Sequence, residues 1–170
     1  MATYFIADTH FGSDAILHYE NRPFSSVAEM DRVMINRWNE TVISEDLVYH
    51  LGDFGAEGNE AEILARLNGI VYLVKGNHDT QSNEYYRRAG FQEVYDLPVL
   101  LQNFWILSHE PLYVNTNMPY ANLFGHVHAN SQYRDFSPQH FCVCVERIGY
   151  APVSLEEIVH TIQQRDCLEV

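Results

Sequence analysis

The chain has 170 residues, of which 46% are hydrophobic and 13% aromatic. This composition excludes an intrinsically disordered protein, and we expect a single globular domain over residues 1–170. Ten Lys and Arg against 23 Asp and Glu give a formal net charge of −13, which argues against extended contact with nucleic acid. No apolar stretch approaches the roughly 18 residues of a membrane span and the N-terminus lacks a signal-peptide pattern, so we expect a cytoplasmic protein without a membrane partner.

The first predicted strand covers residues 4–7 and runs directly into Asp8 and His10. Alternate residues of an extended segment lie on one side, so both side chains can face the same point beyond the strand. We expect residues 11–26 to be irregular, because Pro23 and a pair of serines interrupt them. Ser26 is a plausible cap for a following helix, in which apolar residues recur at helical spacing up to Val42.

The middle of the chain alternates strands and helices. Residues 47–51 predict a strand that ends at Gly52 and Asp53, and a helix should follow over residues 60–67. Residues 70–74 predict a third strand, which leads into Gly76-Asn77-His78-Asp79, and residues 83–89 a short helix closed by Gly90. This order implies parallel strands with right-handed crossovers.

The pattern changes after residue 91. Strand-like runs at 94–101, 104–107, 121–124 and 141–145 are separated only by loops, which predicts a second, partly antiparallel sheet. Ser154 is a plausible cap for a C-terminal helix. We therefore predict the α/β fold class, as a four-layer-type sandwich of two mixed sheets flanked by helices.

Metal-capable side chains follow most of the predicted strands, where ligands bind in open α/β sheets. They comprise two carboxylates, one amide and five imidazoles: Asp8, His10, Asp53, Asn77, His78, His109, His126 and His128. This set exceeds the needs of one ion and suits two divalent ions about 3.5 to 4 Å apart, bridged by one carboxylate. Its mixed oxygen and nitrogen donors favour Mn, Fe, Zn, Co or Ni over Mg.

Five blocks in this order resemble the calcineurin-like metallophosphoesterase family, and they extend from residue 8 to residue 128. The blocks are Asp8-x-His10, Gly52-Asp53, Gly76-Asn77-His78-Asp79, the His109 loop and Gly125-His126-x-His128. The resemblance implies the family's fold and a hydrolase of phosphodiesters or small phosphomonoesters with two divalent metal ions, Mn foremost.

The resemblance also implies a role for each residue. One metal would be held by Asp8, His10, Asp53 and His128, and the other by Asp53, Asn77, His109 and His126. A hydroxide bridging the ions would be the nucleophile. His78 would face the phosphorus as proton donor or charge stabiliser, and Asp79 would orient the His78 ring.

The second block separates branches of the family. Gly52-Asp53 continues with Phe54 rather than the Asp-Arg-Gly of protein phosphatases, so the chain looks more like the small bacterial and phage phosphoesterases. That subgroup carries an Arg-Pro-Phe in its first loop, which Arg22-Pro23-Phe24 matches. Arg22 is therefore a candidate substrate-binding residue, with an exposed structural Arg as the alternative.

The remaining histidines and cysteines that we considered are expected to have structural or surface roles rather than to bind metal. We expect His50 to pack beside the site rather than ligate, and His18 to face solvent or approach the substrate. Cys142-x-Cys144 lacks the spacing and the second pair of a zinc site, and these residues with Cys167 do not form a disulfide framework.

Two other functions compete with a small-substrate phosphoesterase. A non-catalytic scaffold for protein interaction is one, although such relatives usually lack ligands that are all present in this chain. A nuclease acting on short nucleic-acid ends is the other, and the net charge of −13 argues against long polynucleotides. A small phosphorylated substrate is the expected partner, and the sequence leaves the oligomeric state open.

Overall fold

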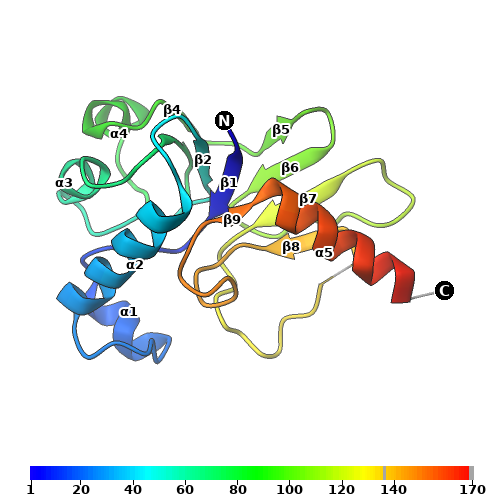
Figure 1. Cartoon of the computed structure of the whole chain (residues 1–170), viewed down its shortest axis with the longest axis horizontal. Coiled ribbons are helices and arrows are strands. Elements are labelled where there is room, and N and C mark those ends of the chain that lie inside the picture. The colour runs from blue at the N-terminus through cyan, green and yellow to red at the C-terminus, as the bar shows by residue number, and fades with distance from the viewer. Residues whose placement is uncertain (136, 169–170) are drawn as a thin grey trace.

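The structure is a computed structural model that describes residues 1–135 and 137–168, with the side chains of 166–168 left out. Its larger sheet is built mostly by the first half of the chain (Figure 1). The strand order is β4-β3-β2-β1-β9, and every neighbouring pair is parallel except β1 with β9. The strands are β1 (Thr3–Ile6), β2 (Leu47–His50), β3 (Ile70–Val74), β4 (Glu93–Tyr95) and β9 (Val153–Ser154).

The second sheet has four strands in the order β5-β6-β7-β8. They are β5 (Val99–Leu101), β6 (Trp105–Ser108), β7 (Ala121–Phe124) and β8 (His140–Cys142). Only β5 and β6 run antiparallel, so the expected partly antiparallel sheet is confirmed. Together the two sheets and their helices confirm the predicted class, an α/β sandwich of two mixed sheets flanked by helices.

Helices cover one face of the larger sheet (Figure 1). They are α2 (Val27–Thr41), α3 (Glu60–Leu64) and α4 (Asn83–Ala89). Helix α2 begins where the sequence predicts, because Ser26 Oγ accepts a hydrogen bond from the backbone N–H of Glu29. Its buried Met30, Met34 and Trp38 pack in one hydrophobic cluster with strand residues such as Ile6 and Val48. The helical spacing in the sequence thus marks the face that packs on the sheet.

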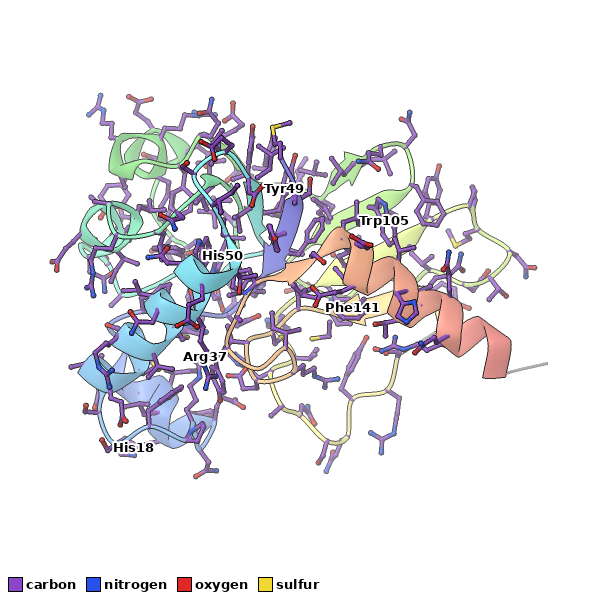
Figure 2. The ribbon with its side chains drawn as sticks, viewed as in Figure 1. His18, Arg37, Tyr49, His50, Trp105 and Phe141 are labelled. Carbon is purple, nitrogen blue, oxygen red and sulfur yellow. The ribbon has the colours of Figure 1, made fainter. Side chains whose placement is uncertain are left out.

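The opposite face of the larger sheet packs against the second sheet. Tyr49 of β2 and Trp105 of β6 belong to this second core (Figure 2), together with Phe5, which neighbours Ile6 and points the other way. Helix α5 (Leu155–Leu168) contacts β1, β8 and β9 and contributes Ile158 to the same core. Burial on both faces explains why the strands are short apolar runs rather than alternating ones.

The two sheets meet at one rim, just beyond β1. The backbone N–H of Ala7 donates to Val143 O, and Ala7 forms an isolated parallel bridge with Cys144. The backbone N–H of Asp8 donates to Gly52 O, which joins the ends of β1 and β2. The loops that follow several strands are therefore held together at this rim.

Several predicted boundaries were wrong. Residues 14–19, expected to be irregular, form helix α1 (Asp14–Tyr19), which buries Ile16 and Leu17. The run 94–101 is two strands in different sheets, because Pro98 interrupts it, and β8 ends at Cys142 before the bridge to Ala7. Helix α3 ends at Leu64 rather than residue 67. Within the described residues, no helix combines the length and apolarity needed to cross a membrane.

Candidate metal centre

The metal-capable residues have an unusual backbone conformation. Asp8, His10, Asp53, His126 and His128 all have positive φ, between 45° and 69°. This left-handed region is uncommon for residues other than glycine and costs on the order of 1 to 3 kcal/mol for each. The surrounding structure must therefore hold these loops, and the strain is concentrated where the side chains converge.

Glycines make this convergence possible. A Cβ at Gly76 would lie 2.2 Å from Asp53 Oδ1, and one at Gly125 would lie 2.4 Å from Asp8 Oδ2. The glycines of the Gly-Asn-His and Gly-His blocks are thus needed for close approach of the backbone to the carboxylates. The backbone N–H of His126 uses this space to donate to Asp8 Oδ2 at 2.8 Å.

Asp53 lies at the centre of the gathered side chains. Its Oδ2 is 3.6 Å from His10 Nε2 and 3.5 Å from His109 Nε2, while its Oδ1 accepts a hydrogen bond from the backbone N–H of His78. One carboxylate oxygen therefore faces imidazole nitrogens from two different loops. This is the arrangement that a bridging ligand requires.

Asn77, His109 and His126 form one group of donors beside Asp53. Asn77 Oδ1 is 3.0 Å from both His109 Nε2 and His126 Nδ1, and these two nitrogens are 3.2 Å apart. The His109 Nδ1–H donates to the carbonyl of Leu51 at 2.8 Å, which leaves the lone pair of Nε2 free to face the cluster.

Asp8, His10 and His128 form a second group, whose donor atoms lie within 4.8 Å of one another, and Asp8 also groups in this way with Asp53 and His109. His128 Nε2 is 3.6 Å from Asp8 Oδ1. Asp8 Oδ1 and His10 Nε2 are buried and make no hydrogen bond within the described part of the chain. Since an unsatisfied buried lone pair is costly, these two atoms fit a cation between them.

The electrostatics of the metal-free site agree with this interpretation. Burial, opposed in part by His109 and His128, raises the pKa of Asp8 to about 6. The pKa of His10 is lowered to about 2, mainly by burial and to a smaller extent by the neighbouring His128 and Arg22. The site therefore disfavours both a charged Asp8 carboxylate and a charged His10 imidazole. A bound cation would favour the charged carboxylate and would bind the neutral imidazole.

An open cavity of about 570 Å³ lies over these donors. It is lined by His10, Ser13, Ala15, Ile16, Tyr19, Glu20, Asp53, Asn77, His78, His126 and His128. The exposed His78 ring makes an edge contact with the His10 ring, with 5.3 Å between their centroids. The structure thus brings His78 to the same cavity as five of the seven predicted ligands, and among the described residues Asp8 and His109 do not line it.

Asp79 does not contact the ring of His78, contrary to the role implied by the resemblance. Its carboxylate accepts hydrogen bonds from the backbone N–H groups of Asp53, Phe54 and Gly76. The expectation that Asp79 orients His78 is therefore corrected: Asp79 ties together the loops that carry Asp53 and Asn77.

The predicted substrate contact of Arg22 is also corrected. Its side chain has 0% exposure and is absent from the described cavity lining. The guanidinium instead pairs with Glu146 and donates to the carbonyls of Asp8 and Thr9. Asn21, with φ 47°, precedes it and turns the chain inward. Arg22 therefore lies behind the metal-capable residues rather than in front of them.

The sequence interpretation missed two contributors. Glu146 accepts from His128 Nδ1 at 3.1 Å, and it directly follows the apolar run 141–145, the same signal that marked the other strand ends. Helix α1 supplies Ala15, Ile16 and Tyr19 to the cavity, and Ser13-Asp14 before Ile16 was its available signal.

Some of the side chains expected to be structural stand next to the predicted ligands, and the Cys144 thiol hydrogen-bonds the Asp8 carboxylate. His50 packs beside the site, where its ring is 2.9 Å from Thr9 Oγ1, and His18 is exposed on α1. Cys142 and Cys144 are buried free thiols, and the side chain of Cys167 falls outside the described residues.

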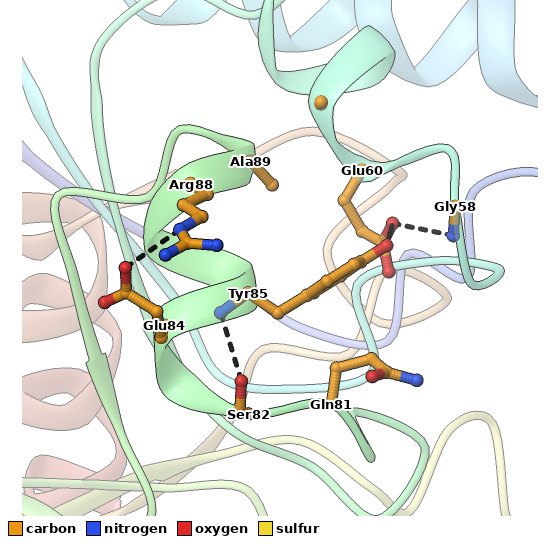
Figure 3. Close-up of a pocket in the computed structure, with 9 residues that line it drawn as sticks. Gly58, Glu60, Gln81, Ser82, Glu84, Tyr85, Arg88 and Ala89 are labelled. Carbon is orange, nitrogen blue, oxygen red and sulfur yellow. Dashed lines mark hydrogen bonds and ion pairs between the residues drawn. The ribbon is translucent and has the colours of Figure 1, made fainter.

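A second hollow, of about 450 Å³, lies between α3 and α4 (Figure 3). Glu60 there accepts hydrogen bonds from Tyr85 and from the backbone N–H of Gly58, and Ser82 caps α4. Among the described residues that line it, none is one of the predicted ligands. The predicted metal ligands thus indicate that the cavity lined by α1, rather than this hollow, is the candidate functional site.

Comparisons with known proteins agree with this geometry. Residues 1–141 match the family model described as calcineurin-like phosphoesterase. An uncharacterized protein of Methanocaldococcus jannaschii is 36% identical over 169 residues, which cover 95% of this chain and 91% of that protein. The crystal structure of a protein of unknown function from Aquifex aeolicus is similar with a TM-score of 0.71 and 26% identity, covering 94% of this chain and 98% of that one.

Proposed function

The chain belongs to the calcineurin-like phosphoesterase family, and from this premise we propose that it hydrolyses phosphodiesters at a site for two divalent metal ions. One observation carries the proposal. Asp8 Oδ1 and His10 Nε2 are buried without a hydrogen-bond partner among the described residues, and a second set of donors, from Asn77, His109 and His126, gathers beside Asp53. Two cations, with Asp53 between them, would satisfy both sets.

We assign the proposed ligands to two ions, following the two groups of donors that the structure brings together. One ion would be held by Asp8, His10, Asp53 and His128, and the other by Asp53, Asn77, His109 and His126. When bound, the ions supply Lewis-acid stabilisation of the phosphate and lower the pKa of an attacking water. Three oxygen and four nitrogen ligands favour Mn, Fe, Zn, Ni or Co, and we propose Mn first.

His78 is the proposed catalytic residue. It is exposed at the cavity, and Asp53 Oδ1 holds its backbone N–H at 2.8 Å. From this position its ring can stabilise charge on the phosphate or donate a proton to the leaving oxygen. The Asp53 carboxylate would thus both bind the metal ions and position the loop that carries the proton donor His78.

The cavity lining supports a diester rather than a monoester. A phosphomonoester carries close to two negative charges at pH 7, whereas a diester carries one. Among the described lining residues there is no Lys or Arg, and Glu20 adds a negative charge. Ala15, Ile16 and Tyr19 form a wall suited to an apolar or aromatic substituent.

We propose a small phosphodiester as the substrate partner. The net charge of −13 argues against long polynucleotides, because their binding depends on clustered Lys and Arg. A dinucleotide or the end of a short strand fits the open cavity of about 570 Å³ without requiring such a cluster.

The direct test is hydrolysis by protein depleted with EDTA and then loaded with Mn²⁺. We expect turnover of bis(p-nitrophenyl) phosphate, with a higher kcat/KM than for p-nitrophenyl phosphate, and loss of both activities after EDTA. A dinucleotide and a long single strand should then separate the small-substrate proposal from a general nuclease. Absence of hydrolysis with both aryl esters would overturn the proposed activity.

A further inference from the structure

A buried ion pair lies directly behind the candidate metal centre. Glu146 Oε1 accepts from Arg22 Nε at 2.9 Å and from a terminal guanidinium nitrogen at 2.7 Å. The two side chains are 0% and 5% exposed and come from positions 124 residues apart. Burying two charges is costly, and Glu146 Oε2 has no partner within the described residues, so this pair is poor support for stability alone.

The Arg22 side of the pair holds the first ligand loop. The guanidinium donates to the carbonyl of Asp8 at 2.6 Å and to the carbonyl of Thr9 at 2.8 Å. This loop contains Asp8 and His10 in the left-handed conformation, with φ of 59° and 48°. Two charge-assisted hydrogen bonds therefore stabilise a strained backbone that carries two of the proposed ligands.

The Glu146 side holds a third ligand. Its Oε1 accepts from His128 Nδ1 at 3.1 Å, while His128 Nε2 faces Asp8 Oδ1 at 3.6 Å. A carboxylate that accepts from one ring nitrogen fixes the orientation of the imidazole and leaves the other nitrogen free for a cation. Glu146 therefore aims His128 at the same point as the loop that Arg22 holds.

The remaining ligands are held by other groups. His109 donates to the carbonyl of Leu51, and Asp79 accepts from the backbone N–H groups of Asp53 and Gly76. Neither Arg22 nor Glu146 contacts Asn77, His109 or His126 through any hydrogen bond or ion pair of the described residues. The pair thus acts on one half of the ligand set.

We propose that Arg22 and Glu146 are positioning residues for one ion of the pair, the one held by Asp8, His10 and His128. The ion held by Asn77, His109 and His126 binds without their help. This inference rests on the proposed two-metal function and assigns the Arg of the first loop to the ligands rather than to the substrate.

The test is Mn²⁺ titration of metal-free wild type and E146Q, with bound Mn²⁺ followed by EPR. Wild type should bind two ions and give the spectrum of a magnetically coupled pair. In E146Q one ion should bind as in wild type and the other about 10- to 100-fold more weakly, so that the spectrum of an isolated Mn²⁺ dominates at equal loading.

A second variant guards against misfolding of E146Q. E146D keeps the negative charge but withdraws the carboxylate from both Arg22 and His128 by one methylene, so it should weaken the same single ion. E93Q is the matched control, because it removes the exposed Arg87–Glu93 pair on another part of the surface, and both ions should bind it as in wild type. Circular dichroism of each metal-free variant checks folding.

Two results would overturn the inference: unchanged binding of both ions in E146Q and E146D, or equal weakening of both. Wild type that binds a single ion would instead contradict the two-metal proposal. If E146D then bound that ion unchanged, the positioning role would fail as well.

Discussion

Single residues at the candidate metal centre have different backbone and side-chain constraints, so we expect them to tolerate different substitutions. The left-handed backbone of Asp8, Asp53 and His126 is held by hydrogen bonds from neighbouring loops, and adjacent glycines leave room for the carboxylates. The ligands, the proton donor and the space between them should therefore respond differently to substitution.

Asp53 and His78 should separate metal binding from catalysis. D53N removes the charge that faces two imidazoles, so Mn²⁺ affinity should fall. H78N leaves the ligands in place, so both ions should remain bound while kcat falls by about 10²- to 10⁴-fold. Metal analysis and diester kinetics on the same samples check this, and equal metal loss in the two variants would contradict the assigned roles.

Gly125 should be needed for its lack of a side chain. In G125A the new Cβ would meet Asp8 Oδ2 at 2.4 Å and Ala7 Cβ at 2.6 Å, so Asp8 must move. We expect Mn²⁺ affinity to fall more than about tenfold and the free energy of unfolding to fall by about 1–3 kcal/mol. G58A is the control, because its Cβ has open space although its φ is positive. Normal Mn²⁺ binding by G125A would refute this explanation.

His50 should make the metal-free protein sensitive to acid. Thr9 Oγ1 donates to Phe54 O at 2.6 Å, so it accepts from His50 Nε2–H, and the neutral ring leaves its buried Nδ1 unpartnered. Burial, with a smaller effect of His109, lowers the pKa of His50 to about 3. The unfolded state, with a pKa near 6.5, therefore binds the extra proton between about pH 6.5 and 3.

Stability from His50 is thus complete above about pH 6.5 and is lost as the pH falls towards 3. Between pH 7.5 and 5, denaturant unfolding of metal-free wild type should lose about 2 kcal/mol that H50Q does not lose. H18Q changes an exposed histidine and should keep the wild-type pH dependence. Identical pH dependence in H50Q and wild type would exclude this source of acid sensitivity.

At the scale of elements, α1 is the helix that lines the cavity over the candidate metal centre. It places Ala15, Ile16 and Tyr19 on the cavity wall, next to Glu20, which is half-buried. A carboxylate oxygen of Glu20 lies within 4.8 Å of donor atoms of His128 and Glu146. In the proposed function, Glu20, the residue directly after α1, would therefore set the charge that a bound phosphate meets.

Removing that charge should relax the preference for diesters. E20Q should raise kcat/KM for p-nitrophenyl phosphate on the order of fivefold, about 1 kcal/mol, and change the diester value less. D14N removes an exposed carboxylate from the same helix and should change neither value. A diester-to-monoester ratio that stays constant in E20Q would contradict the charge argument.

At the scale of the whole molecule, the candidate metal centre gathers loops from both sheets. The ligands follow β1, β2, β3, β6 and β7, so bound ions would link segments from residue 8 to residue 128. In a chain with a net charge of −13, they would also neutralise buried carboxylates. Metal binding should therefore stabilise the entire fold.

Mn²⁺ at about 100 times its Kd should add about 2.7 kcal/mol per independent site to the free energy of unfolding. Guanidinium unfolding with Mn²⁺, after EDTA, and after Mn²⁺ is restored would measure this. In D53N, Mn²⁺ should increase the free energy of unfolding by less than in the wild type. Superimposable curves for the loaded and stripped wild-type protein would show that these loops bind no stabilising ion.

The sequence alone was sufficient for much of the fold and for the donor set. Apolar runs set β3 and β7 at their observed bounds, and the Ser26 cap and helical spacing set α2, because these signals are local. Since parallel strands end at a common edge, donors that follow successive strands must lie near one another. Their chain order therefore predicted that the candidate donors converge, and the structure brings them together.

Only the tertiary structure decided what supports these donors and which side chains line the cavity over them. Arg22 turns inward to a glutamate 124 residues away, and Asp79 binds backbone N–H groups rather than the ring of His78. No local pattern encodes these contacts, because hydrogen-bond partners of a buried polar group are chosen by whatever loops packing brings within about 3 Å. The sequence thus determined which groups can bind metal, and packing determined how each is held.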